Sequence, residues 1–239
     1  MKYKIADLII EYNAKYKMTK QRSEKYKIKD NKKADISIDV SDERIKKLEK
    51  KHENNTLETS EYMIIGTEFY KKLLSYNGCL LHSSAVVVDN EAYLFSADSG
   101  IGKSTHTSLW LKYLSEKNPY VINDDKPAIR IMENDIYCYG TPFSGKYDIN
   151  ENKRVKLKAI CFIEQSDQNI IKKVETKEAI NLFFRQTVTK LSKSNMNKFF
   201  DILEIILKEI PIYKLSCNMS KEAVMLAYNT MKGTKNKWD

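Results

Sequence analysis

The residue types best suited to chemistry lie at positions 97 to 104, which read Ala-Asp-Ser-Gly-Ile-Gly-Lys-Ser. This run matches the phosphate-binding pattern G-x-x-x-x-G-K-[ST] at every fixed position but the first, where Ala97 replaces glycine. Backbone N–H groups around Gly100 and Gly102 can turn toward phosphate oxygens. The Lys103 ammonium adds a positive charge, and the Ser104 hydroxyl can bind Mg²⁺. The residues expected to contact a nucleotide are Asp98, Ser99, Gly100, Ile101, Gly102, Lys103, Ser104 and Thr105.

Two adjacent carboxylates, Asp124 and Asp125, follow the apolar run 120–123. A phosphate-binding loop needs a carboxylate near the metal, and a kinase also needs a base for the proton of the attacking hydroxyl. Because neighbouring residues on a strand point to opposite sides, one aspartate can face the metal and the other the acceptor. Considered alone, the pair is explained equally well by a surface turn before Lys126.

Two weaker candidates flank these motifs. His82 lies in the apolar run 80–88, where a lone histidine is more often a packed core residue than a catalytic one. Lys146 closes the glycine-bearing turn 139–146, where it can meet a phosphate or an anionic acceptor. A plain surface turn explains Lys146 equally well. The sequence does not place the basic residues Arg154 and Arg185.

Hydrophobic periodicity predicts the elements that must position these residues. The run 92–95 predicts a strand directly before the 97–104 loop, and the pattern 103–114 predicts a helix directly after it. A strand, loop and helix in this order are the context that a phosphate-binding loop requires. Further strands are predicted at 3–12, 35–40, 80–88, 120–123, 128–132, 136–139, 157–163 and 212–215. Further helices are predicted at 41–51, 60–76, 177–188, 195–208 and 220–231.

Antiparallel hairpins mixed with single helices predict an α/β fold with a mixed β-sheet core, a phosphate-binding loop (P-loop) and flanking helices. We expect one domain over residues 1–239, because seven glycines and four prolines leave little room for linkers. Residues 1–76 would supply accessory strands and helices, 77–165 the core with the loop, and 166–239 a mainly helical C-terminal part. The strongly basic segment 15–35 is predicted as surface strands and loops.

Composition narrows the class of protein. The net charge is +9, but the lysines are spread along the chain among acidic neighbours, which is typical of a solvated surface. No zinc-finger, RNA-binding or basic-zipper pattern occurs, so no nucleic-acid partner is expected. No apolar run approaches the length of a membrane span, and the N-terminal residues do not resemble a secretory signal. The four cysteines are scattered, so we expect a cytoplasmic protein with reduced thiols and no membrane association.

His82, the 97–104 loop and the Asp124–Asp125 pair together resemble, in type and order, the HPr kinase/phosphorylase family. That family shares its catalytic core with the ATP-dependent phosphoenolpyruvate carboxykinases. The resemblance covers about residues 78–165, and the family's loop differs in having glycine where this chain has Ala97. The turn that ends at Lys146 is similar to a feature of the shorter HPr kinase-like proteins.

The resemblance implies roles for individual residues. Lys103 and the loop amides would bind the phosphates of ATP, while Ser104 and Asp125 would hold Mg²⁺. Asp124 would deprotonate the acceptor hydroxyl, with His82 close enough to tune it. The implied activity is transfer of the γ-phosphoryl group to a hydroxyl, above all serine, of a peptide, small protein or metabolite.

Several alternatives stay open. The sequence contains no clear counterpart of the family's separate N-terminal domain or of its glycine-rich stretch after the acidic pair, which leaves HPr as acceptor and the reverse phosphorylase reaction undecided. Related kinases commonly form symmetric oligomers, so the resemblance allows a homo-oligomer for this chain as well as a monomer. A nucleotide-binding regulator or peptide-recognition protein without transfer activity also fits the motifs. A carboxykinase-type enzyme would need an additional transition-metal site and an arginine for its oxoacid.

Overall fold

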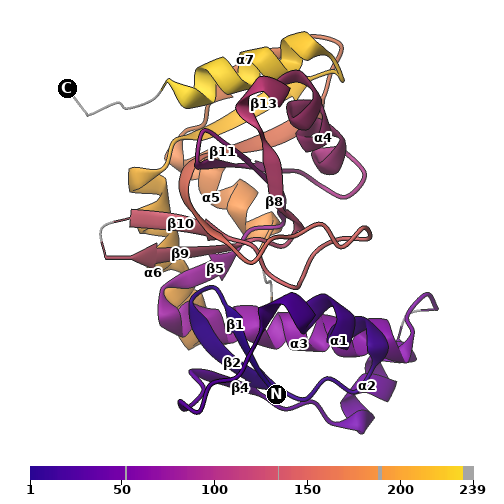
Figure 1. The fold of residues 1–239 in the computed structure, drawn as a ribbon. Coiled ribbons are helices and arrows are strands. Elements are labelled where there is room, and N and C mark those ends of the chain that lie inside the picture. The colour runs from indigo at the N-terminus through magenta and orange to yellow at the C-terminus, as the bar shows by residue number, and fades with distance from the viewer. Residues whose placement is uncertain (52, 134, 188–189, 234–239) are drawn as a thin grey trace.

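The computed structural model describes residues 1–51, 53–133, 135–187 and 190–233. Within these ranges the chain forms a four-stranded sheet and a nine-stranded sheet, with helices packed against both. Figure 1 shows the smaller sheet with helices α1, α2 and α3 in one layer, and the larger sheet with the remaining helices in the other. The predicted α/β fold with mixed strand directions is therefore observed. No helix in the described ranges has both the length and the hydropathy of a membrane span.

The smaller sheet corrects one sequence prediction. The single strand predicted at 3–12 is wrong, because the chain reverses at Ala6 and Asp7 and its two halves pair as an antiparallel hairpin. Both turn residues have left-handed backbone angles, with φ of 52° and 60°, as a two-residue hairpin turn requires. The sheet order is β3-β1-β2-β4, formed by β1 (Lys2–Ile5), β2 (Leu8–Tyr12), β3 (Lys27–Ile28) and β4 (Ile36–Ile38).

Three helices complete this layer. The segment 15–35, predicted as strands and loops, contains the short strand β3 but begins with a helix that was not predicted. The helix predicted after Ser41 is confirmed, and the Ser41 hydroxyl caps it by accepting a hydrogen bond from the backbone N–H of Arg44. The longest helix of the layer begins at a capping box formed by Thr56 and Thr59. The bounds are α1 (Lys17–Ser23), α2 (Asp42–Glu49) and α3 (Leu57–Leu73).

The larger sheet has the order β5-β9-β10-β11-β7-β6-β8, with β13 paired to β11 and β12 paired to β13. Strand β11 runs parallel to both β7 and β13, whereas the other neighbours are antiparallel. The strands are β5 (Gly78–Leu80), β6 (Ser83–Val88), β7 (Glu91–Ser96), β8 (Tyr120–Asp125), β9 (Ala128–Met132), β10 (Asp135–Tyr139), β11 (Arg154–Gln165), β12 (Ile170–Lys173) and β13 (Ile212–Cys217).

Helices cover both faces of this sheet. Side chains on β6 alternate between the two faces: Ala85 and Val87 join one core cluster, while Val86 and Val88 join the other. Helices α5 and α6 close the first cluster, and α4 and α7 close the second. The bounds are α4 (Lys103–Tyr113), α5 (Thr176–Arg185), α6 (Lys193–Glu209) and α7 (Lys221–Lys232). Because helices cover both faces of this sheet, loops that join its strands to helices lie at the sheet's edges and can bring their residues together there.

Most elements of the larger sheet and of its covering helices lie where the sequence predicted them, with ends that differ by a few residues. The run 80–88 divides into β5 and β6 at Leu81 and His82. Strand β12 was not predicted, because the short polar run around it carries no strong alternation. Helix α5 ends at Arg185, and Val188, the predicted end of that helix, lies outside the described residues.

Candidate functional site

The 97–104 loop joins the end of β7 to the start of α4, as the sequence predicted. Gly100 and Gly102 have φ of +85° and +113°, backbone angles that favour glycine. Gly102 is the last residue before the helix, and Lys103 is the first residue within it. Because the first N–H groups of a helix have no partner inside the helix, this turn presents backbone donors and the positive end of the helix dipole to an anion.

Lys103 lies folded across the loop. Its Nζ atom donates a hydrogen bond to the carbonyl of Ala97 at 2.9 Å, and the residue is buried. Burial lowers the pKa of Lys103 below its usual value, while the negative charges of Asp125, Asp124 and Asp98 oppose that effect. Among the described residues, the ammonium donates to the backbone carbonyls of Ala97 and Asp98. A charge-assisted hydrogen bond to a phosphate oxygen is stronger than a hydrogen bond to either carbonyl.

Ser104 connects the loop to the acidic pair. Its hydroxyl donates a hydrogen bond of 2.8 Å to Oδ1 of Asp124, near the end of β8. Asp124 is 7% exposed, so this contact ties the first turn of α4 to the sheet with little competition from water. The resemblance pairs Ser104 with Asp125, whereas the observed partner is Asp124.

Asp125 contacts two basic side chains. Its Oδ1 lies 2.7 Å from Nε2 of His82, and its Oδ2 contacts the ammonium of Lys126. Burial would raise the pKa of Asp125, but the hydrogen bond from His82 and the charge of Lys126 outweigh burial and lower it to about 2. The backbone of Asp125 has φ of 124°, a strained value for a residue other than glycine. The resemblance places His82 beside Asp124, and the observed neighbour is Asp125.

Gln186 was missed by the sequence analysis. Its side chain lies between His82 and the loop: Oε1 is 3.1 Å from Nδ1 of His82, and Nε2 donates to Oδ1 of Asp98 at 2.6 Å. Its backbone carbonyl also accepts a hydrogen bond of 2.7 Å from the N–H of His82. Gln186 follows the end of α5, 104 positions after His82, and no motif in the sequence marks it.

The turn 140–150 forms a wall beside the two aspartates. The N–H of Gly145 donates to the carbonyl of Asp124 at 2.5 Å, and Asp125 forms an antiparallel bridge with Ser144. A Cβ at Gly145 would lie 3.1 Å from that carbonyl, so the close approach depends on glycine. Lys146 is exposed at the tip of this turn, with its ammonium over the ring of Tyr147.

The N-terminal layer anchors this wall. The Tyr62 hydroxyl lies 2.8 Å from the carbonyl of Ser144, and Arg22 donates to the same carbonyl at 2.8 Å. The Tyr70 hydroxyl is 3.0 Å from Oγ1 of Thr141. Helices α1 and α3 therefore support the chain segment that lies against Asp124 and Asp125.

The two unplaced arginines lie apart from these contacts. Arg154 forms an ion pair with Asp7 at 3.0 Å and stacks over Tyr137, which joins β11 to the N-terminal hairpin. Arg185 is exposed at the end of α5, one residue before Gln186. Within the described part of the chain, neither guanidinium contacts the 97–104 loop or the acidic pair.

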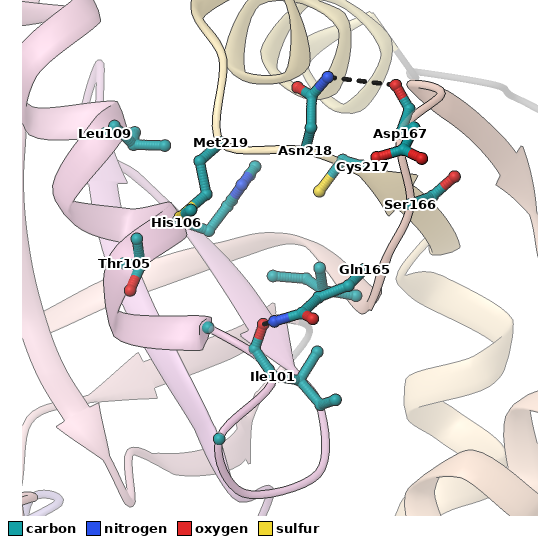
Figure 2. Close-up of a pocket in the computed structure, with 13 residues that line it drawn as sticks. Ile101, Thr105, His106, Leu109, Gln165, Ser166, Asp167, Cys217, Asn218 and Met219 are labelled. Atoms are coloured by element: carbon teal, nitrogen blue, oxygen red, sulfur yellow. Dashed lines mark hydrogen bonds between the residues drawn. The ribbon is translucent and has the colours of Figure 1, made fainter.

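A pocket of about 510 Å³ adjoins the loop. Figure 2 shows the loop and α4 on one side of it and the segment around Gln165 and Asn218 on the other. Gln165 donates to the carbonyl of Ile101 at 3.0 Å, so the two sides are in contact beneath the pocket. The lining residues are Gly100, Ile101, Gly102, Thr105, His106, Leu109, Ile163, Gln165, Ser166, Asp167, Cys217, Asn218 and Met219.

The donor set at the loop suits a hard divalent cation. Mg²⁺ takes oxygen ligands and is usually held by one or two protein side chains together with substrate phosphates and water. The Ser104 hydroxyl and the Asp124 carboxylate provide two such oxygens 2.8 Å apart. In the described ranges, no cluster of three or more His, Cys, Asp and Glu side chains is arranged to hold a metal unaided.

Comparison with known proteins gives a fold likeness alone. No family model and no curated protein matches the chain. Among solved structures, the chain is similar to the HPr(Ser) kinase/phosphatase from Coxiella burnetii, with a TM-score of 0.34 and 12% sequence identity. The match covers 64% of this chain and 99% of that chain. A likeness of this size assigns neither a family nor an activity.

Proposed function

We propose that this chain is a Mg²⁺-dependent kinase that transfers the γ-phosphoryl group of ATP to the hydroxyl of a peptide, small protein or metabolite. The observation that carries the proposal is the Ser104–Asp124 hydrogen bond at the N-terminus of α4, directly behind the Gly100–Gly102 turn. It would join a turn suited to phosphate to a carboxylate suited to Mg²⁺, the two parts that phosphoryl transfer requires.

The phosphates would bind at the loop. Backbone N–H groups between Gly100 and Ser104 face an anion at the helix terminus. Lys103 would leave the carbonyl of Ala97 and donate to a phosphate oxygen, because a charge-assisted hydrogen bond is stronger than one to a carbonyl. Each added phosphate charge favours the protonated ammonium and so opposes the effect of burial.

The two aspartates would divide the remaining work. The contact with Ser104 supports Asp124 as the carboxylate that holds Mg²⁺ with that hydroxyl. The contact with His82 supports Asp125 as the carboxylate on the acceptor side, where it would orient the hydroxyl and take its proton. A weak base is sufficient, because a loose transition state depends mainly on positioning and charge neutralisation.

The nucleoside would occupy the pocket beside the loop. That pocket shares Gly100, Gly102 and Thr105 with the phosphate site, so a phosphate chain bound at the loop leads into it. Apolar side chains at Ile101 and Leu109 would pack against the base, as in most small-molecule sites.

One observation favours a second function, that of a nucleotide-binding regulator without transfer. His82 contacts one oxygen of Asp125 and Lys126 contacts the other, so both oxygens are already engaged in this state. In a kinase the acceptor hydroxyl would have to share one of these oxygens with a basic side chain, whereas a regulator needs no such contact.

A transfer assay separates the two functions. The protein is incubated with γ-labelled ATP, Mg²⁺ and a panel of serine peptides and small hydroxy compounds. We expect label on an acceptor, and we expect Asp125→Asn to lower the rate by at least about a hundredfold while ATP still binds. Transfer by the Asp125→Asn protein at the wild-type rate contradicts the acceptor-side role. ATP binding without transfer to any acceptor, and without phosphate release, supports the regulator.

A further inference from the structure

His106 stands at the inner wall of the pocket, one turn into α4. The residue is 4% exposed, and its ring packs against Phe95 with centroids 4.7 Å apart. Figure 2 shows His106 on the α4 side of the pocket, across from Gln165 and Asn218. A lone histidine in such a helix is usually a packed core residue, and the sequence analysis predicted no role for His106.

A hydrogen bond fixes the tautomer of this ring. The indole N–H of Trp110 donates to Nε2 of His106 at 3.1 Å. Indole nitrogen can only donate, so Nε2 carries no hydrogen. The hydrogen of the neutral imidazole therefore sits on Nδ1.

The Nδ1–H group has no hydrogen-bond acceptor among the residues that the structure describes. This nitrogen is not fully buried either. Among the described residues, the side-chain polar atoms that are both fully buried and without a partner are the hydroxyls of Thr19 and Ser60. His106 lines the pocket, so a ligand bound there can come within reach of the Nδ1–H group. A recessed donor without a partner is costly unless a ligand supplies an acceptor.

From this geometry we infer that His106 is a specificity-determining residue, whose Nδ1–H donates to an acceptor atom of the nucleobase, either a ring nitrogen or a carbonyl oxygen. The inference rests on the proposed function, which places the nucleoside in this pocket. A planar base suits the site because the aliphatic chains of Ile101 and Leu109 line the pocket together with His106. The rings of Phe95 and Trp110 are fully buried behind His106 and hold its imidazole in place. Trp110 acts through His106 by holding the required tautomer.

The test compares two substitutions of His106, one that removes the Nδ1–H donor and one that keeps an N–H group close to its position. His106→Phe removes both ring nitrogens, whereas His106→Asn keeps an N–H group near the position of Nδ1. Both variants leave the Trp110 N–H without its acceptor, so any structural cost of that loss is shared. Calorimetric titrations with ATP, ribose 5-triphosphate and inorganic tripolyphosphate, each with Mg²⁺, separate the base, the sugar and the phosphates.

We expect His106→Phe to raise the Kd for ATP about tenfold, the effect of one lost hydrogen bond, and to leave the Kd for tripolyphosphate and ribose 5-triphosphate unchanged. His106→Asn should stay within about threefold of the wild type for ATP. An unchanged Kd for ATP in His106→Phe, or an equal loss for tripolyphosphate, overturns the inference.

Wild-type binding separates this inference from the proposed function. Equal wild-type affinity for ATP and tripolyphosphate overturns the inference and leaves the phosphate site intact. That comparison needs no variant and decides the matter if His106→Phe does not fold. If neither ATP nor tripolyphosphate binds to the wild type, the proposed function itself is contradicted.

Discussion

The hydroxyl of Ser104 donates a hydrogen bond of 2.8 Å to Oδ1 of Asp124, although the two residues are 20 positions apart in the sequence. Ser104 lies in the first turn of α4, and Asp124 lies near the end of β8. The contact therefore connects the helix that follows the glycine turn to the strand that carries both aspartates. The proposed metal-binding role of Ser104 and Asp124 depends on this connection.

Removal of the Ser104 hydroxyl should weaken metal-dependent binding. Ser104→Ala deletes one oxygen ligand, so we expect the Mg²⁺ concentration for half-maximal ATP binding to rise about tenfold, with metal-free binding nearly unchanged. Titration of ATP at a series of Mg²⁺ concentrations measures this. Ser108→Ala is the matched control, because that hydroxyl lies one turn further along α4 and donates to the carbonyl of Ser104. Equal effects of the two substitutions contradict a metal role for Ser104.

The pairing of Asp125 should appear in the pH dependence of stability. Its folded pKa of about 2 lies below the usual value near 3.9, so the ionised carboxylate contributes about 2 kcal/mol to the free energy of unfolding. Because the folded pKa is lowered, that contribution is complete above about pH 4 and is lost as the pH falls through about 2.

Denaturant unfolding of Asp125→Asn tests this pairing. We expect a loss of about 2 kcal/mol near neutral pH, shrinking below about pH 4. The exposed residue Asp39 provides the control Asp39→Asn, for which little change is expected. A variant as stable as the wild type at neutral pH shows that His82 and Lys126 do not stabilise the ionised Asp125.

The sequence was sufficient to predict the β7, loop and α4 unit, because the glycine pattern and the flanking periodicity occur within 24 consecutive positions, from Glu91 to Leu114. It was not sufficient to predict which aspartate faces Ser104. Adjacent carboxylates on a strand point to opposite sides, so that choice depends on strand pairing, which shifts by an irregularity between Ala85 and Val86. The left-handed backbone of Asp125 adds a further local change of direction.

Gln186 shows a second limit of sequence reasoning. The residue follows the last turn of α5, and its partners His82 and Asp98 lie in other parts of the chain. Only the packing of α5 against the larger sheet brings the three together. The hairpin at 3–12 was missed for a different reason: its turn residues, Ala6 and Asp7, are not the Asn-Gly type that marks such turns.

Gln186 should affect the rate of transfer more than nucleotide affinity. Gln186→Leu frees both Asp98 and His82, so the imidazole at Asp125 loses its fixed orientation. We expect kcat to fall about ten- to a hundredfold, while the Kd for ATP changes less than about threefold. Thr187→Val is the control, because it removes a neighbouring hydrogen bond to the carbonyl of Leu80 without touching either partner. An equal loss of kcat in both variants indicates a purely structural role.

The central claim is that the 97–104 loop holds the phosphates of a Mg²⁺-bound nucleotide, and calorimetric titration of ATP against the wild type and Lys103→Ala tests it most directly. Lys112→Ala is the control, since that lysine is exposed near the end of α4 with its ammonium over the ring of Tyr113. We predict saturable, Mg²⁺-dependent binding to the wild type, weakened at least about a hundredfold in Lys103→Ala and within about threefold of the wild type in Lys112→Ala. Equal binding by the wild type and Lys103→Ala, or no binding by the wild type at millimolar ATP, contradicts it.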